Sequence, residues 1–167
     1  MIREPNLNKK KMEESFNIEE ILREFQELPV VEKLETYLSR WNRTSPIIIT
    51  EIEKHRSEIE KKLGTINGIV WLKENLSPEQ LYNFSKVNKE ASIIIDYDIL
   101  NKRVEHIVVL EELVCSSSNS ASLWPVRFKN KEEFKFKGRI IVFSNYTRKQ
   151  ISKKESLKYI DRDCIKI

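Results

Sequence analysis

Glycine is scarce in this chain, with three residues in 167. A loop that binds phosphate through its backbone N–H groups needs glycine, because a residue without a side chain permits the tight turn and the close approach of the ligand. The composition therefore argues against a glycine-rich ligand loop.

Metal-binding residue types are equally scarce. The two cysteines, Cys115 and Cys164, lack metal-ligand spacing and form no disulfide framework, so we expect free thiols in a reducing cytoplasm. The only two histidines, His55 and His106, are not spaced to meet carboxylates at a metal. We expect no metal and no cofactor, with weak ATP and Mg²⁺ binding left open, and no motif supports a serine or cysteine triad.

Long apolar runs are also missing. No run approaches the roughly 20 residues that a membrane-spanning helix needs, and the first 20 residues are too polar for a signal peptide. A chain of 167 residues that is 40% hydrophobic and 34% charged is typical of one soluble domain with its own core. We expect a cytoplasmic protein without membrane contact, in the host cytoplasm if the chain is viral.

Short β-branched runs alternate with helical patterns from residue 46 onward. Three runs, 47–49, 91–95 and 140–143, are continuously apolar, which is typical of parallel strands covered on both faces by helices. The sequence therefore predicts an α/β fold. The expected strands are 47–49, 68–72, 91–95, 140–143 and 164–167, the expected helices are 52–63, one starting at Ser77-Pro78, 100–114 and 153–161, and a hairpin is expected over 124–137.

The chain divides into three regions. Residues 1–13 are predicted to form a flexible basic arm, and residues 14–45 two N-terminal helices separated by Pro29. Asn17 has capping-box spacing to Glu20 at the start of the first helix. Residues 46–167 form the expected α/β core.

Basic residues are concentrated near the C-terminus. Residues 127–158 contain eleven lysines and arginines against three glutamates, a net charge of +8 within a chain of net charge +4. Such asymmetry is typical of a surface that binds a polyanion, although charge runs are often only solvated faces.

Three segments carry a resemblance to a known family. Ile93–Asp98 ends an apolar run with acidic residues, Phe134–Asn145 places a basic aromatic stretch before Gly-Arg-Ile-Ile-Val-Phe-Ser-Asn, and Ile160–Ile165 carries an arginine near the end of the chain. With the order of the elements, these segments resemble the ATPase core of the AAA+ family, especially phage- and virus-encoded helicases and replication initiators. The resemblance covers about residues 30–167. It implies a P-loop NTPase-like parallel sheet of about five strands with helices on both faces and no lid domain.

The phosphate-binding loop of that family would follow strand 47–49. Thr50 and His55 stand at the two glycine positions, Arg56 at the lysine position and Ser57 at the Mg²⁺-binding hydroxyl. We expect the side chains at 50 and 55 to crowd the turn, and a planar guanidinium does not place its charge as a lysine ammonium does. ATP binding in the usual way is therefore not expected.

The resemblance assigns further positions of this degenerate nucleotide site. Asp96 would be the carboxylate near Mg²⁺, Tyr97 replaces the acid that activates water, and Asp98 would only partly substitute for it. Asn145 would be the polar sensor, although it could equally be an ordinary turn residue. Arg162 would be the counterpart of an arginine finger, although a surface ion pair is an equally good interpretation. The resemblance implies an inactive ATPase with no catalytic residues.

Our first functional hypothesis is a nucleic-acid-binding, replication-associated module of a DNA transaction. Its contacts would come from the hairpin and the basic stretch after it, with Phe128, Phe134 and Phe136 either stacking on bases or filling the core. The expected contact residues are Trp124, Arg127, Lys129, Lys131, Lys135, Lys137, Arg139, Arg148 and Lys149.

Two alternatives remain open. A subunit without ATPase activity could act as a protein–protein adaptor or homo-oligomer within an ATPase assembly. A metal-dependent nuclease would need carboxylates such as Glu51, Asp96, Glu111 and Glu112 to meet, but no recognisable spacing of acids and lysine on a strand supports it.

Overall fold

The computed structural model describes residues 18–20, 23–24, 27–39, 46–100, 103–118 and 125–167. The chain separates into two compact units, Met1–Trp41 and Asn42–Ile167. The expected basic arm, the cap Asn17 and the expected contact residue Trp124 lie outside the described residues.

The first unit contains helix α2 (Val30–Ser39). The helix begins directly after Pro29, whose carbonyl accepts a hydrogen bond from the Lys33 N–H at 3.0 Å. Residues 18–20 before it are also helical.

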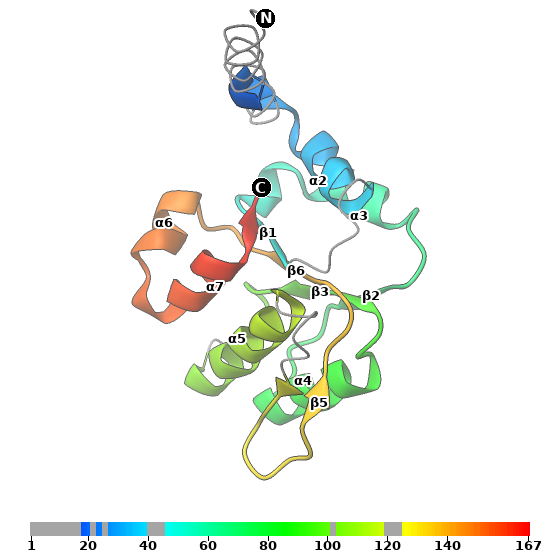
Figure 1. Ribbon diagram of the computed structural model, residues 1–167, viewed down its shortest axis with the longest axis vertical. Coiled ribbons are helices and arrows are strands. Elements are labelled where there is room, and N and C mark those ends of the chain that lie inside the picture. Colours follow the sequence, from blue (N-terminus) through cyan, green and yellow to red (C-terminus); the bar gives the residue numbers. More distant parts are fainter. Residues whose placement is uncertain (1–17, 21–22, 25–26, 40–45, 101–102, 119–124) are drawn as a thin grey trace, which may run out of the picture. The chain divides into compact units, whose positions relative to one another are not determined.

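The second unit is built on a five-stranded parallel sheet with the order β2-β3-β6-β1-β7 (Figure 1). This arrangement confirms the α/β fold and the five parallel strands predicted from the sequence. The strands are β1 (Ile47–Ile49), β2 (Ile69–Leu72), β3 (Ser92–Asp96), β6 (Ile140–Phe143) and β7 (Ile165–Lys166).

Alternation along the strands divides the sheet into two faces. Ile48, Val142 and Ile95 lie level with one another in three neighbouring strands and belong to the main hydrophobic cluster. That cluster also takes in residues of α4 (Pro78–Val87), α5 (Val104–Ser118) and α7 (Lys158–Asp163). The opposite face carries Ile94 and Phe143, which line a pocket together with α3 (Arg56–Leu63). Helices therefore cover both faces, with α3 across the sheet from α4 and α5 (Figure 1).

Capping boxes fix the starts of two helices. The helix predicted to start at Ser77-Pro78 is α4, where Ser77 and Gln80 form a reciprocal capping pair with Pro78 in the first turn. Thr147 and Gln150 form a second capping box, at the start of α6 (Arg148–Lys153). The prediction missed this one and placed the helix start at residue 153. The structure has α6, a 3₁₀ turn η3 (Glu155–Leu157) and α7 there instead of a single helix.

The predicted hairpin is present as β4 (Pro125–Val126) and β5 (Phe134–Lys135), which pair antiparallel. Its aromatic residues face inward: Phe128, Phe134 and Phe136 are all buried. The Tyr82 ring of α4 packs against Phe128 at 5.6 Å and Phe134 at 5.2 Å between centroids. These phenylalanines therefore fill the core and are not free to stack on bases.

Two other elements differ from the prediction. The expected helix 52–63 is divided into a 3₁₀ turn η1 (Ile52–Lys54) and α3, with His55 between them. Helix α5 continues to Ser118, into the stretch predicted as a loop. Ser116 explains the continuation. Its buried hydroxyl accepts the Phe136 N–H at 3.2 Å, so the protein takes the place of solvent as the hydrogen-bond partner of this serine.

Candidate functional site

The candidate site lies where the C-terminal ends of three neighbouring strands meet. Ile49 and Asp96 both lie level with Phe143, which ends the strand between them. The helix that follows β1 covers one face of the sheet, whereas α7, which leads from β6 to β7, packs on α5 at the other face. A change of face between neighbouring strands is where α/β sheets form their ligand crevices.

The backbone N–H groups of the loop after β1 donate hydrogen bonds to acceptors within the protein. The N–H groups of Thr50, Glu51 and Ile52 reach the carbonyls of residues 167, 146 and 144, each at 3.0 Å. The Glu53 N–H donates to the Asn145 Oδ1 at 3.2 Å. The next two N–H groups close the 3₁₀ turn by donating to the carbonyls of residues 51 and 52. All six donors from 50 to 55 therefore have protein acceptors, whereas a phosphate-binding loop directs such groups at the ligand.

The backbone strain in this loop does not fall at the expected positions. Glu51 has φ 49° and ψ 44°, a left-handed conformation that favours glycine. His55 has φ −132°, which any residue adopts, and Thr50 is buried with its hydroxyl donating to the Ile167 carbonyl at 2.9 Å. Of these three residues only Glu51 takes a glycine-like conformation, and the assignment of Thr50 and His55 to the two glycine positions of a phosphate-binding loop stays a prediction.

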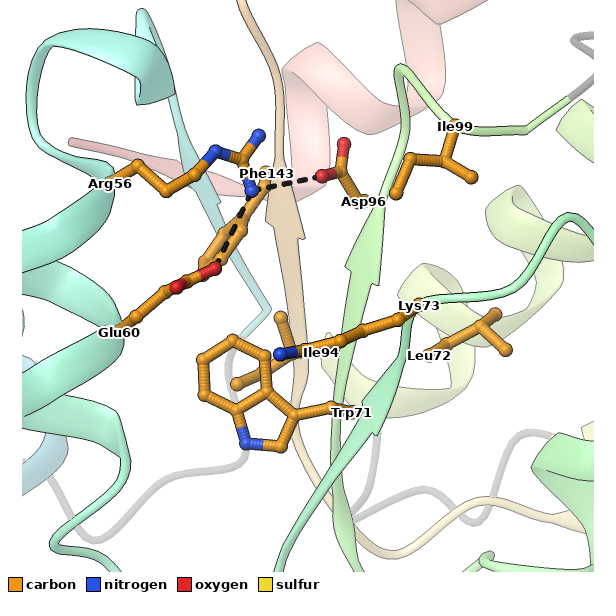
Figure 2. Close-up of a pocket in the computed structure, with 9 residues that line it drawn as sticks. All are labelled: Arg56, Glu60, Trp71, Leu72, Lys73, Ile94, Asp96, Ile99 and Phe143. Carbon is orange, nitrogen blue, oxygen red and sulfur yellow. Dashed lines mark ion pairs between the residues drawn. The ribbon is translucent and has the colours of Figure 1, made fainter.

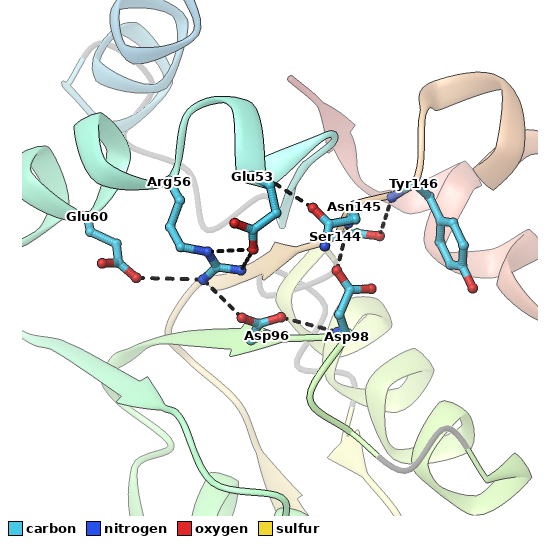
Figure 3. A network of polar contacts seen from close by, with 8 residues as sticks. All are labelled: Glu53, Arg56, Glu60, Asp96, Asp98, Ser144, Asn145 and Tyr146. Atoms are coloured by element: carbon cyan, nitrogen blue, oxygen red, sulfur yellow. Dashed lines mark hydrogen bonds and ion pairs between the residues drawn. The ribbon is translucent and has the colours of Figure 1, made fainter.

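Arg56 occupies the centre of the site (Figure 3). Its guanidinium lies 3.0 Å from the Asp96 carboxylate, 2.8 Å from Glu53 and 3.6 Å from Glu60. It also stacks over the Phe143 ring, with 5.9 Å between the guanidinium carbon and the ring centroid. Burial lowers the pKa of Arg56, but hydrogen bonds and charge interactions with Glu53 and Asp96 outweigh burial and raise this pKa above its ordinary value.

Asp96, Asp98 and Asn145 form a chain of hydrogen bonds beside Arg56 (Figure 3). The Asp98 N–H donates to Asp96 Oδ1 at 3.2 Å, and the Asn145 N–H donates to Asp98 Oδ2 at 2.8 Å. Since the Asn145 side-chain oxygen accepts the Glu53 N–H, this residue ties β6 to the loop after β1. The sequence assigned Arg56, Asp96, Asp98 and Asn145 to one site. In the structure these residues are joined to one another by an ion pair and hydrogen bonds.

Tyr97 belongs to the opposite side of β3. Its side chain is buried and packs 6.0 Å from the Tyr146 ring. Burial, with smaller contributions from Tyr146 and Asp98, raises the pKa of Tyr97 to about 12. Tyr97 therefore stays neutral and packs in the core.

A small pocket opens beside the arginine (Figure 2). Its volume is about 110 Å³, well below the roughly 300–1,000 Å³ of typical ligand pockets. The Trp71 ring lies 6.0 Å from Phe143 in an edge-on contact, and the Lys73 ammonium covers it at 4.9 Å. The residues that line the pocket are Arg56, Glu60, Trp71, Leu72, Lys73, Ile94, Asp96, Ile99 and Phe143.

Sequence reasoning missed four residues of this region. Glu53 and Glu60 lie three positions before and four after Arg56, a spacing that places side chains together on a helix and could have indicated their ion pairs. Trp71 and Lys73 stand at the C-terminal end of β2, but no sequence pattern indicates that this edge strand reaches the site.

The remaining nucleotide-site positions, Ser57 and Arg162, take no part in the ion pairs or the ring contact of the Arg56 guanidinium. Ser57 is exposed on α3. Arg162 is in α7, where its guanidinium pairs with Asp163 at 3.0 Å and stacks on Tyr159 at 5.0 Å. It lines a separate hollow of about 280 Å³ between α5 and α7, together with Val108, Glu111, Glu112, Cys115 and Tyr159.

The carboxylates of the nuclease alternative do not meet. Glu51 pairs with Lys54 at 2.7 Å, Asp96 pairs with Arg56, and Glu111 and Glu112 line the hollow on α5. Burial raises the pKa of both Glu111 and Glu112. Within the described part of the chain, no three histidine, cysteine or acidic residues gather as metal ligands would.

Most hairpin cations that were expected to contact nucleic acid have carboxylate partners. Arg127 pairs with Glu133 at 2.9 Å, Lys129 with Glu105 at 3.2 Å and Lys131 with Glu79 at 2.6 Å. Lys135 and Lys137 are exposed. Arg139 is 7% exposed, and desolvation lowers its pKa. A buried guanidinium cannot contact a phosphate at the surface, which removes Arg139 from the expected contact set.

The stretch from Arg148 to Lys158 carries its charge differently. Arg148 donates to the Lys166 carbonyl at 2.9 Å, and the Lys154 ammonium lies over Tyr146 at 4.6 Å. Lys149, Lys153 and Lys158 are exposed and form no ion pair with any other described residue.

None of the described helices combines the length and the apolar character that crossing a membrane requires. Comparison with protein families, with characterised proteins and with solved structures finds no match. Functional conclusions therefore depend on this chain's own residues.

Proposed function

We propose that this protein is a catalytically inactive relative of the AAA+ ATPases that binds nucleic acid and no longer uses a nucleotide. The setting that this role suits best is DNA replication or another DNA transaction. The proposal combines a strand-end site that cannot accept a nucleotide with a surplus of exposed positive charge elsewhere on the same unit.

The observation that carries the proposal is the position of Arg56. A nucleotide-binding site needs free backbone donors for the phosphates and a carboxylate available to Mg²⁺. Here the Asp96 carboxylate is paired with Arg56 at 3.0 Å, and the loop donors are already bonded to the protein. For Mg²⁺ and ATP to bind, both the ion pair and the loop hydrogen bonds would have to break.

Nucleic-acid binding follows from the charge. The protein has a net charge of +4, and its basic C-terminal region is chemically suited to phosphate backbones. Because counterion release drives such binding, the affinity should fall steeply as salt is added.

The test is a pair of titrations of the purified protein. Fluorescent ATP with Mg²⁺ should show no saturable binding, whereas labelled DNA should bind at low salt and lose affinity as salt increases. Arg56→Lys is the informative variant, because it restores the lysine but leaves the loop donors occupied, and it too should bind no ATP. Saturable ATP binding by either protein, or no DNA binding at low salt, would overturn the proposal.

An adaptor function is the second candidate, and it has a specific observation in its favour. Val104 is 78% exposed on α5, and Val108 and Tyr159 are 41% and 43% exposed beside the hollow between α5 and α7. Exposed apolar side chains around a hollow are typical of protein contacts. Light scattering across a range of concentrations tests self-association directly: Val108→Asp should abolish any dimer that this surface forms.

A further inference from the structure

Exposed charge is distributed unequally over the two basic regions of the protein. In the hairpin, Arg127, Lys129 and Lys131 each have a carboxylate within 3.2 Å, and only Lys135 and Lys137 are exposed without an ion pair to another described residue. The stretch 148–158 contains five basic residues and one acidic residue, Glu155. An ion pair screens a cation from a polyanion, so equal numbers of lysines and arginines do not represent equal attraction.

The acidic residues next to this second region are also occupied. Asp161 binds the Lys166 ammonium at 2.7 Å, and Asp163 binds Arg162. Neither carboxylate pairs with Lys149, Lys153 or Lys158, and these three lysines form no ion pair with any other residue that the structure describes. Helices α6 and α7 pack against each other (Figure 1). Lys149 and Lys153 belong to α6, and Lys158 is the first residue of α7.

Local geometry adds a second argument. Lys149 and Lys153 are four residues apart on α6, a spacing that puts both ammonium groups on the same side of the helix. The buried Ile151 turns the opposite side inward. Like charges at this spacing destabilise a helix, and a bound polyanion would relieve their repulsion.

We propose that the exposed face of α6 and the start of α7 binds the phosphate backbone of double-stranded nucleic acid through Lys149, Lys153 and Lys158. This inference rests on the proposed function and names the surface and the form of nucleic acid. A duplex is the better partner because it has the higher charge density, and because each tyrosine near this face already has a cation over its ring, Lys154 over Tyr146 and Arg162 over Tyr159. Binding through phosphates alone carries no base specificity.

Two variants with the same change in net charge test the location. The α6–α7 variant carries Lys149→Gln, Lys153→Gln and Lys158→Gln, and the hairpin variant carries Arg127→Gln, Lys129→Gln and Lys131→Gln. All six positions are exposed, so circular dichroism and thermal unfolding should confirm that both variants fold. The probe is a fluorescein-labelled DNA duplex of about 20 base pairs and mixed sequence, with the same strand alone for comparison.

We expect the α6–α7 variant to bind the duplex at least about tenfold more weakly near 0.1 M salt, with a salt dependence smaller by about 0.9 for each lysine removed. The hairpin variant should stay within about twofold of the unmodified protein, because its cations are paired. The unmodified protein should prefer the duplex to the single strand.

The outcomes separate this inference from the proposed function. If the unmodified protein binds DNA and the hairpin variant alone loses affinity, the surface is wrong while the function stands. Tighter binding to the single strand overturns the duplex assignment. Competition by polyglutamate as effective as that by duplex of equal charge would mean an acidic protein partner. Absence of DNA binding at low salt removes both proposals together.

Discussion

At the scale of single residues, Arg56 decides what the strand-end site can do. It is the one cation within 4 Å of Asp96 among the described residues, and the Asp96 side chain is only 8% exposed. A carboxylate at such a position needs a positive partner, because an unpaired buried charge is costly.

Arg56→Ala should therefore lower the free energy of unfolding by about 2–3 kcal/mol, a value below that for fully buried pairs because the arginine is 28% exposed. Urea denaturation measures it. In a double-mutant cycle with Asp96→Asn, the double variant should be less destabilised than the sum of the single variants by more than about 1 kcal/mol. Strict additivity would show that the pair contributes nothing.

Glu51 provides a second prediction. Its left-handed backbone is unfavourable for a residue with a side chain, so Glu51→Gly should raise the melting temperature by about 2 °C despite the greater entropy of glycine in the unfolded chain. The control is Glu51→Ala, which removes the ion pair with Lys54 but keeps the strain and should give no increase. A lower melting temperature for Glu51→Gly would show that the carboxylate matters more than the backbone.

At the scale of secondary structure elements, the junction before β6 is the most constrained. A Cβ on Gly138 would lie 1.7 Å from the Ala91 carbonyl oxygen, and the Ser117 hydroxyl donates to the Gly138 carbonyl at 3.3 Å. Gly138 therefore sets how closely the start of β6 approaches the residue before β3.

Gly138→Ala should destabilise the protein by about 3 kcal/mol, since the clash is with backbone and one of the two strands must move. Gly64→Ala is the matched control. The φ of Gly64 is −62° and its nearest contact would be 3.2 Å, so this change should cost less than about 1 kcal/mol. Thermal unfolding of both proteins provides the comparison, and equal effects would contradict the packing described for Gly138.

The strands were more predictable than the connections between them. The apolar runs around Ile48, Ile94 and Ile141 have no polar face, which is typical of strands buried on both sides. The structure places all three strands at the predicted positions. The division of 52–63 at His55 and the extension of α5 past Ser116 were not predictable, because both depend on hydrogen bonds to residues far away in the sequence.

At the scale of the whole molecule, the contacts of the candidate site were also not predictable where they join residues far apart in the sequence. The sequence brought Arg56, Asp96 and Asn145 to one sheet edge because parallel strands end together. It could not show that Arg56 pairs with Asp96, nor that the hairpin cations are compensated by Glu79 and Glu105, which lie on other elements. The net charge of a segment is counted from its residues, whereas the attraction of its cations for a polyanion depends on the ion pairs they form in the fold.

The two-unit organisation leads to a prediction of its own. Among the described residues, every member of the main hydrophobic cluster lies within 42–167. A fragment of those residues should therefore fold alone and unfold in one cooperative urea transition. Loss of the near-ultraviolet circular dichroism of its two tryptophans and its tyrosines in native buffer would show that the fragment does not fold.

The loop after β1 also has a consequence for local motion. The N–H groups from Thr50 to His55 all have acceptors, and four of these acceptors lie on the segment after β6 or at Ile167. The amide hydrogens bound to these four acceptors can therefore exchange with deuterium only when those segments separate from the loop. Ligand loops are normally among the least stable parts of a protein. Here this loop would open only together with the sheet edge, as part of the rigid framework.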